Sequence, residues 1–497
     1  MPLTRRRLLQ AAAIAAAASA YRGPLAALAG AGAVADYDDG NADVPGDLEG
    51  DPGRVIVVGA GFAGLTVANA LREAGVDCVV LEARKRLGGR AWTRDVGGSA
   101  VDLGCSWIHE PVGNPMATFA DQAGIGQTNA DIELDLATIR FFDGYTGELT
   151  LPEKLDAFSH IVAFEEEAPA ISAELGAGAS GRDGARAYLD DHGLTGDARR
   201  RAEFMIRIYM QQGDAIDWQR LNLHYFANYE SPYTGVGQGN FPTGGYRGLV
   251  RAMAGPSDVR LGHRVRAIHR DGGGVRVSAE LDGGARRRVF RGSHVVVTLP
   301  LGVLQHGDVD FSPRLPPRKR RAFRRPWFGQ FEKVAMTFEE PFWQEGVHTH
   351  VLHLSERVPM EFPLFLDLQK LSGVPTLVGI SSARFARTMD RLRRAEVRGV
   401  ALAVLEKTLG RDVPAPVASK VTRWWRDPYS RGSYTSIPVG SSLNALDELA
   451  RPVGGRLLFA GEATSRARVG YADGAMSTGI REAKRLLQAP SVQLRAY

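Results

Sequence analysis

The apolar positions around residue 55 predict a buried strand, a tight turn and a helix. Residues 55–58 are four consecutive apolar, mostly β-branched side chains, and three glycines follow within the next six positions. Apolar residues then recur at helical spacing, namely Leu65, Val67, Ala68 and Leu71. A second apolar run at residues 78–81 predicts a neighbouring strand. This order of elements predicts a βαβ unit with parallel strands.

Further along the chain, the apolar pattern predicts a second kind of architecture. Residues 259–268, 274–281 and 289–299 run apolar or alternate, as strands do, and residues 331–338 alternate with period two. Residues 352–354, 363–368 and 376–381 are expected to join the last strand in an antiparallel sheet. Residues 131–229 are charged and rich in alanine, with amphipathic helical stretches, and residues 395–409 form another such helix. The pattern predicts an α/β fold: a doubly wound Rossmann-like domain plus an α+β domain with a mixed or antiparallel sheet and a helical insertion.

The glycine turn after residue 58 has the spacing of a dinucleotide site. Gly59 permits the turn, Gly61 lets a pyrophosphate approach the backbone, and Gly64 lets helix and strand pack closely. The second strand ends in Glu82, where an acid binds the adenosine ribose hydroxyls. A βαβ unit without a nucleotide is the alternative, because glycine turns occur in many folds.

Amino-acid composition adds a distinct prediction mainly for the N-terminal segment. Residues 4–10 carry a twin-arginine pattern, an alanine-rich stretch follows, and residues 33–35 offer a small-residue cleavage site. We expect residues 1–35 to be an export leader, and a disordered basic tail is the alternative. The net charge of +5 includes four leader arginines, so residues 36–497 carry +1 and give no argument for nucleic-acid binding. No stretch is apolar enough to span a membrane, and two cysteines predict no metal site.

Two motifs after the second strand resemble the flavin amine oxidase superfamily. The segment E-A-R-K-R-L-G-G-R, from residue 82, precedes D-L-G-C-S-W-I-H-E, from residue 102. The W-I-H form is closest to polyamine oxidases, and the resemblance covers residues 54–487. It implies a discontinuous FAD-binding domain of residues 52–130, 243–320 and 415–490. The segment before it, residues 36–51, is acidic and contains Pro and Gly, so we expect it to be flexible. Residues 131–242 and 321–414 are then the substrate-binding domain.

The resemblance also implies which residues hold FAD. Gly88 and Gly89 allow close backbone approach, and Arg84 and Arg90 are placed to face phosphate charge. The other positions that match cofactor-binding residues of the family are Trp107, Val265, Trp424, Glu462, Tyr471 and Ala472. Ser433 stands where monoamine oxidases carry the cysteine that attaches flavin. Serine cannot form that thioether, so FAD is expected to be bound non-covalently.

Four residues are candidates for catalysis. Lys333 matches the family lysine that holds a water against flavin N5, and an outward-facing strand lysine is the alternative. Tyr434 and Tyr471 match the aromatic pair that flanks the amine, although either could be a core tyrosine. His109 matches the loop histidine of polyamine oxidases. Glu110 is a candidate to hold a remote ammonium group of the substrate, or else a surface glutamate.

The expected reaction explains why an aromatic pocket matters. An alkylammonium with a pKa near 10.4 is only about 0.04% neutral at pH 7, so reaction from the neutral amine costs about 4.6 kcal/mol. Desolvation lowers that pKa without a strong base. The product imine is hydrolysed to an aldehyde, and O2 is expected to be reduced to H2O2.

The substrate class depends on fewer residues. Trp107 stands where amino-acid oxidases of the superfamily place a carboxylate-binding arginine, which argues against an amino acid, and the candidate acid Glu110 favours a polyamine. A monoamine oxidase, an L-amino-acid oxidase, a protein-lysine demethylase and an FAD-dependent desaturase stay open as alternatives. The particular amine, the bond cleaved and the oligomeric state are left open by the sequence.

Overall fold

A computed structural model describes residues 48–129, 140–229, 231–233, 239–343, 352–354 and 361–497. The predicted export leader, residues 1–35, and most of the segment 36–51 lie outside the described residues. No helix among the described residues is both long and apolar enough to cross a membrane.

A five-stranded parallel sheet forms the centre of the first domain. Its order is β10 (Asp258–Arg260), β2 (Cys78–Leu81), β1 (Val55–Val58), β14 (His294–Val297) and β23 (Leu457–Phe459). All four side chains of β1 are buried, because this strand has a neighbour on each side and a layer on each face. The predicted α/β fold class is confirmed.

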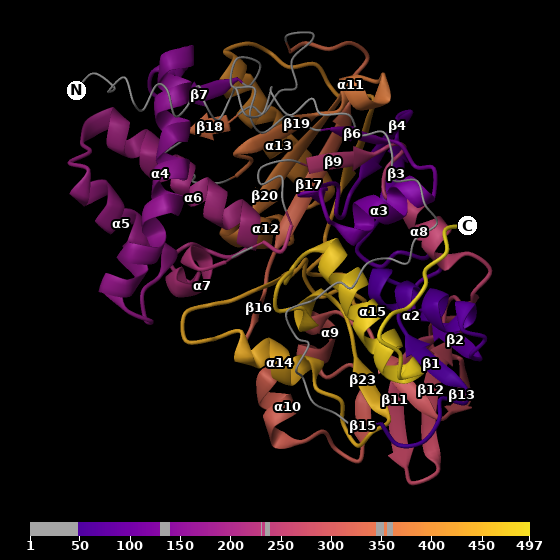
Figure 1. Cartoon of the computed structure of the whole chain (residues 1–497). Helices are drawn as coiled ribbons and strands as arrows, with labels where there is room; N and C mark the ends of the chain where they lie inside the picture. The colour runs from indigo at the N-terminus through magenta and orange to yellow at the C-terminus, as the bar shows by residue number, and fades with distance from the viewer. Residues whose placement is uncertain (1–47, 130–139, 230, 234–238, 344–351, 355–360) are drawn as a thin grey trace.

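The two faces of this sheet are covered differently (Figure 1). Helices α2 (Phe62–Glu73), α3 (Pro115–Gln122), α8 (Arg247–Ala254) and α15 (Ala472–Leu487) pack on one face. On the other lies a sheet of β13 (Arg286–Gly292), β12 (Gly274–Leu281), β11 (Arg264–Asp271) and β15 (Asp310–Ser312). Helices α2 and α15 approach closely because Gly479 has no side chain, and a Cβ there would lie 2.6 Å from the Ala63 carbonyl oxygen.

A second large sheet lies outside the parallel-sheet domain. It is antiparallel, in the order β19 (Leu364–Asp367), β20 (Thr376–Ser382), β17 (Phe331–Thr337) and β21 (Ala418–Val421). The expectation that residues 352–354 join this sheet is wrong, since β18 (Leu352–Leu354) pairs in parallel with β7 (Phe141–Asp143). Helix α13 (Arg394–Leu409) packs on the face of this sheet that carries Val334 and Met336.

A separate group of helices lies beside this sheet (Figure 1). It contains α4 (Leu151–Leu175), α5 (Gly181–Asp191), α6 (Gly196–Asp214) and α7 (Leu223–Ala227), which share one apolar core. The capping-box residues Thr150 and Ser180 begin α4 and α5. The C-terminal end of α6 reaches the candidate site, where the Gln212 carbonyl accepts the Tyr434 hydroxyl.

Short elements connect these units. The strands are β3 (Thr93–Val96), β4 (Ser99–Asp102), β5 (Ile108–His109), β6 (Gln127–Asn129), β8 (Gly147–Glu148), β9 (Gly239–Pro242), β16 (Trp327–Phe328) and β22 (Thr435–Ser436). The helices are α9 (Leu301–His306), α10 (Pro317–Ala322), α11 (Gln369–Ser372), α12 (Ala383–Met389) and α14 (Asn444–Ala450), with 3-10 turns at Asp282–Gly284 and Glu462–Thr464.

Candidate active site

The glycine turn between β1 and α2 has the geometry of a phosphate cradle. Gly59 has a φ of 110°, and its N–H donates to the Leu81 carbonyl at 2.9 Å. Gly61 is the N-cap of α2, no side chain caps that helix, and a Cβ added at Gly61 would meet nothing within 4 Å. At Gly64, by contrast, a Cβ would lie 2.0 Å from the Gly59 carbonyl oxygen. The turn therefore leaves space and unsatisfied helix N–H groups for an anion.

Glu82 lies beside this turn at the end of β2. Its carboxylate accepts the Ala60 N–H at 2.8 Å and the Arg84 N–H at 2.7 Å. Burial raises the pKa of Glu82, and these two hydrogen bonds act in the opposite direction. The acid is thus fixed at the carboxyl edge of the parallel sheet, where the dinucleotide pattern expects it.

The Gly88–Gly89 turn packs directly on the glycine cradle. The Gly88 N–H donates to the Ala60 carbonyl at 2.8 Å, and a Cβ on Gly89 would lie 3.5 Å from the Gly61 Cα. Gly88 has a φ of 91°, a conformation that favours glycine. The second glycine pair therefore forms one wall of the cradle.

The two arginines expected to face phosphate have protein partners. Arg84 donates to Asp427 at 2.6 Å and to Ser430 at 2.8 Å. Arg90 donates to Glu462 and to the Ser433 carbonyl, both at 2.8 Å. In this structure the arginines connect the cradle to the C-terminal segment of the chain.

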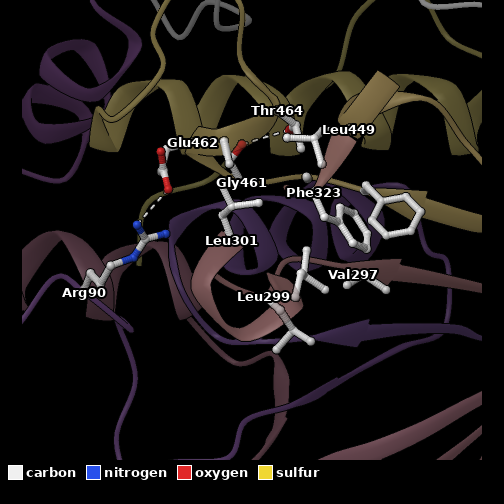
Figure 2. Close-up of a pocket in the computed structure, with 13 residues that line it drawn as sticks. Arg90, Val297, Leu299, Leu301, Phe323, Leu449, Gly461, Glu462 and Thr464 are labelled. Atoms are coloured by element: carbon white, nitrogen blue, oxygen red, sulfur yellow. Dashed lines mark hydrogen bonds and ion pairs between the residues drawn. The ribbon is translucent and has the colours of Figure 1, made fainter. Parts of the chain in front are cut away.

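Figure 2 shows a pocket beside the Arg90–Glu462 ion pair, at the carboxyl ends of β14 and β23. Apolar side chains form its other walls, among them Val297, Leu299, Leu301, Phe323 and Leu449. Glu462 is buried and also accepts the N–H groups of Thr435, at 3.3 Å, and Gly470, at 3.0 Å. The carboxyl edge of a parallel sheet is where α/β domains bind ligands, so the cradle and Glu82 fit a dinucleotide.

Lys333 is buried on β17 and points at the loop after β4. Its ammonium donates to the carbonyls of Asp102 at 3.0 Å and Gly104 at 2.7 Å, and to the Ser106 hydroxyl at 2.6 Å. Burial lowers the pKa of Lys333 to about 8, against the opposing charge of Asp102. All three ammonium protons have acceptors, so a water held at Nζ has to replace one of these contacts.

The opposite face of β17 carries a second buried ionisable group, Glu332. Its carboxyl group accepts the Trp424 N–H at 2.7 Å and the Thr422 hydroxyl, and that hydroxyl accepts the Lys333 N–H at 2.7 Å. Burial raises the pKa of Glu332 to about 8. Trp424 is buried, with its indole N–H donating to the Leu103 carbonyl at 3.2 Å. Glu332 therefore joins the Lys333 strand to the Trp424 loop.

The two candidate cage tyrosines come from separate segments that meet near Gly470. The Tyr434 hydroxyl donates to the Gln212 carbonyl at 2.6 Å, and a Cβ on Gly470 would lie 3.3 Å from the Tyr434 ring. Tyr471 follows at the N-cap of α15, immediately before Ala472. Burial raises the pKa of Tyr471 to about 12, with the charge of Arg468 acting against it. Both phenols are therefore neutral at ordinary pH.

Ser433 lies directly before the first tyrosine and has its hydrogen bonds inside the protein. Its hydroxyl accepts the Phe331 N–H and donates to the Phe331 carbonyl, each at 2.9 Å.

His109 and Trp107 line the same region from the loop around β5. The His109 ring lies edge-on to Tyr471, with ring centroids 5.4 Å apart. Burial lowers the pKa of His109 to about 4, and the charge of Arg468 adds to this effect. The Trp107 ring packs against Phe241 at 5.4 Å and lies 5.5 Å from the Lys333 ammonium. Val265 is buried in β11, away from this cluster, under the parallel sheet.

Glu110 has a protein partner that sequence reasoning missed. Its carboxylate accepts hydrogen bonds from Arg468 and from the Ser231 hydroxyl, the latter at 2.6 Å. The Arg468 side chain is 1% exposed, and its guanidinium lies 3.9 Å from the centroid of the Tyr471 ring. The surface-glutamate alternative is wrong, because the Glu110 side chain is only 14% exposed and is paired with a buried cation.

A second missed acid, Asp214, ends helix α6. Burial raises its pKa to about 7, and in the part of the chain that the structure describes its carboxylate has no hydrogen bond or ion pair. Burial, and after it the charge of Asp214, raises the pKa of Tyr434 and of Tyr225. The amide nitrogen and oxygen of Gln212 are buried without partners among the same residues. The end of α6 thus brings an unmatched carboxylate and an unmatched amide next to the cage.

The described residues contain no group of three or more His, Cys, Asp or Glu side chains that could hold a metal ion. The candidate site brings together a buried lysine, neutral aromatic rings and carboxylates around a dinucleotide cradle.

The chain is similar to known proteins over most of its length. Among curated relatives, Lysine-specific histone demethylase 1 homolog 2 of Oryza sativa subsp. japonica is 33% identical over 458 residues, which cover 88% of this chain and 58% of that protein. The chain thus spans a little over half the length of that relative. Polyamine oxidase 4 of the same plant is 30% identical over 467 residues, covering 90% of this chain and 92% of that protein.

Solved structures and a family profile agree with these relatives. A structure of an engineered putrescine oxidase has a TM-score of 0.71 at 20% identity, and it covers 88% of this chain and 99% of that one, which shows the shared fold. The profile described as flavin containing amine oxidoreductase matches residues 62–487. The chain is therefore a member of the flavin-containing amine oxidoreductase family.

Proposed function

We propose that this chain is an FAD-dependent oxidase of aliphatic diamines or polyamines, which converts a CH–NH group to an imine and reduces O2 to H2O2. The observation that carries the substrate class is the unmatched carboxylate of Asp214 beside the two cage tyrosines. FAD, when bound, supplies the acceptor for the hydride equivalent. The protein has to position the amine, exclude water and set its protonation.

The environment of Asp214 suits a second ammonium group. Asp214 is half-buried, and a partly desolvated carboxylate without a protein partner gains by pairing with a substrate cation. The carboxyl end of α6 adds partial negative charge, and the Gln212 amide offers a further acceptor. A monoamine cannot use these groups, whereas a diamine places one nitrogen in the cage and the other at Asp214.

The aromatic cage suits the reacting nitrogen. Tyr434 and Tyr471 are neutral, and His109 is neutral above about pH 4, so no positive charge on these rings opposes the amine. A desolvated ring pair lowers the pKa of the amine and favours its reactive neutral form. Lys333 is held by Ser106 and by the carbonyls of Asp102 and Gly104, and it can hold a water when one of these contacts is replaced.

An amino-acid substrate fits less well. The buried arginine of this region, Arg468, has Glu110 on one side and Asp473 on the other, so its donors are already used. A substrate carboxylate would compete with two protein carboxylates. A peptide containing methylated lysine is a second candidate, favoured only by the identity to the histone demethylase homologue.

A screen of peroxide release tests the proposal. Putrescine, spermidine and spermine are compared with benzylamine, L-leucine and a dimethyl-lysine peptide, for wild type, Asp214→Asn and the control Asp217→Asn three residues further on. Loss of a charged hydrogen bond of about 1.5–3 kcal/mol raises KM for diamines tenfold or more in Asp214→Asn. Benzylamine and the Asp217→Asn control should show no such change. Equal KM values for putrescine in all three proteins would refute the assignment.

Non-covalent attachment of FAD is part of the proposal. The Ser433 hydroxyl replaces the attaching cysteine and is engaged by the Phe331 backbone. Acid or heat denaturation should release all the flavin as FAD into the supernatant. Flavin that stays with the precipitated protein would contradict non-covalent binding.

We also propose export by the twin-arginine route, on the pattern of residues 4–10 and the small-residue site at 33–35. The mature chain should begin near Asp36. Replacing Arg5 and Arg6 together with Lys should hold the protein in the cytoplasm, as measured by fractionation. Export of that variant at the wild-type rate would remove the leader assignment.

A further inference from the structure

Three distant segments of the chain meet at one buried guanidinium. Arg468 lies in the loop between the Glu462–Thr464 turn and α15, and its side chain is 1% exposed. Its partner Glu110 follows β5, and its partners Tyr229 and Ser231 follow α7. The third segment is the start of α15 with Asp473.

Arg468 donates hydrogen bonds from all three nitrogens of its planar guanidinium group. Nη1 donates to the Glu110 carboxylate, to the Tyr229 hydroxyl at 3.0 Å and to the Ser231 hydroxyl at 3.3 Å. Nε and Nη2 donate to the two oxygens of Asp473, at 2.7 and 3.5 Å. A single planar cation thus binds two carboxylates on different sides, which a lysine ammonium cannot reproduce with the same geometry.

The same guanidinium packs on the aromatic cage. Its carbon lies 3.9 Å from the Tyr471 ring centroid and 4.8 Å from that of Tyr233. Tyr471 in turn meets the His109 ring edge-on. Arg468 therefore contacts one cage ring directly and holds the loop that carries the next ring.

The loop held by Arg468 has a strained residue. Glu110 has a φ of 48°, in the left-handed region that is unfavourable for a non-glycine residue. The bonds from Arg468 and Ser231 to its carboxylate offset this cost. Without them, we expect the backbone from His109 to Glu110 to relax, and the His109 ring to leave Tyr471.

We propose that Arg468 is the positioning residue of the amine cage: it binds no substrate, and by stacking on Tyr471 and fixing Glu110 it sets the ring geometry that determines KM for the amine. This inference rests on the proposed function only for the identity of the ligand. The placement of the Tyr471 and His109 rings by Arg468 is independent of which amine is oxidised.

The test is Arg468→Lys beside the matched control Arg466→Lys. Arg466 lies in the same loop, is about a third exposed and is paired with Asp447 at 2.7 Å, and within the described part of the chain none of its hydrogen bonds or ion pairs is to a cage residue. In the FAD-loaded enzyme Arg468→Lys should raise KM for the best amine about tenfold and change kcat less than threefold, with FAD still fully bound. Hydrogen exchange of the amides of residues 108–110 should become at least tenfold faster. Arg466→Lys should match wild type in all these measurements.

Two outcomes would overturn the inference: wild-type KM and exchange in Arg468→Lys, or equal changes in both variants. If Arg468→Lys does not fold, Glu110→Gln replaces it, because that change weakens the same contact and keeps the arginine paired with Asp473. It should give the same direction of change in KM and exchange, and wild-type values there would also refute the inference. If no amine is oxidised by wild type, the proposed function fails while the exchange measurement still decides the role of Arg468.

Discussion

The nucleotide side and the amine side of the site are built in different ways. The nucleotide side consists of the Gly59–Gly64 turn, Glu82 and the Gly88–Gly89 turn, and its decisive contacts join backbone N–H groups to carbonyls or to the Glu82 carboxylate less than 30 residues away. The amine side consists of Lys333, the two tyrosines, His109, Arg468 and Asp214. There the decisive contacts join side chains far apart, such as Glu110 and Arg468, which are separated by 358 residues. Local backbone geometry makes the first side, and tertiary assembly makes the second.

The difference predicts that the two sides can be damaged separately. A change on the amine side should slow turnover while the flavin stays bound. A change in the glycine turn should affect folding or flavin binding before it affects chemistry. The predictions below test this separation, beginning with the largest effect.

Lys333→Met should lower turnover about 100-fold or more and leave FAD bound. Methionine nearly keeps the length and apolar volume of lysine, but it cannot donate to Ser106 or to a water. Stopped-flow measurement of anaerobic flavin reduction and of flavin reoxidation by oxygen shows which half-reaction slows. If both rates match wild type with FAD fully bound, Lys333 has no role in turnover, and β17 does not contribute to the amine side of the site.

Gly64→Ala and Gly61→Ala separate folding from flavin binding on the nucleotide side. A Cβ at Gly64 meets the Gly59 carbonyl oxygen at 2.0 Å, so the apoprotein should lose about 3 kcal/mol of unfolding free energy. A Cβ at Gly61 meets no protein atom within 4 Å, so that apoprotein should lose less than about 1 kcal/mol. Its affinity for FAD should nevertheless fall tenfold or more, since the methyl group lies where the pyrophosphate approaches.

Denaturant unfolding of the two apoproteins and fluorescence titration with FAD check this pair. A wild-type FAD affinity in Gly61→Ala would mean that the cradle does not bind the pyrophosphate. Equal stability of the two variants would mean that the close approach of α2 to β1 does not depend on Gly64.

The same contrast explains what the sequence could predict. The strand, turn and acid of the nucleotide side appear within 30 residues as an apolar run, three spaced glycines and Glu82, so local periodicity was sufficient. The α/β fold class and the amine oxidoreductase family followed from such local motifs. The pairing of residues 352–354 was wrong, because a short apolar run does not specify its neighbouring strand.

Arg468 and Asp214 could not be found in the same way. An arginine two residues before a glycine, and an acid at the end of an amphipathic helix, are ordinary surface patterns. Their importance comes from burial and from partners that only the folded chain brings together. Glu110 was predicted to meet a substrate cation, and the structure shows that a protein cation already binds it.

The last predicted effect is spread over several pH units and concerns the two buried ionisable groups on opposite faces of β17. Burial raises the pKa of Glu332 to about 8 from an ordinary value of 4.5, so its contribution to stability is lost as the pH rises from about 4.5 to 8. Burial lowers the pKa of Lys333 to about 8 from 10.5, so stability is instead recovered as the pH rises from about 8 to 10.5. Glu332→Gln should therefore remove a negative slope of at most about 1.4 kcal/mol per pH unit in the unfolding free energy below pH 8 and leave the slope above pH 8 unchanged.

The Gln side chain in this variant can still accept the Trp424 N–H and donate to Thr422, so the Trp424 loop should keep its place. Denaturant midpoints of wild type and variant, with excess FAD at pH 5.5, 6.5, 7.5 and 9, measure the difference. Asp102, Asp214 and Asp390, whose pKa values burial also raises, titrate in both proteins, and the comparison cancels most of their effect. Parallel pH profiles for the two proteins would show that Glu332 is ionised in the folded state at neutral pH, and that burial on this face of β17 does not hold its proton.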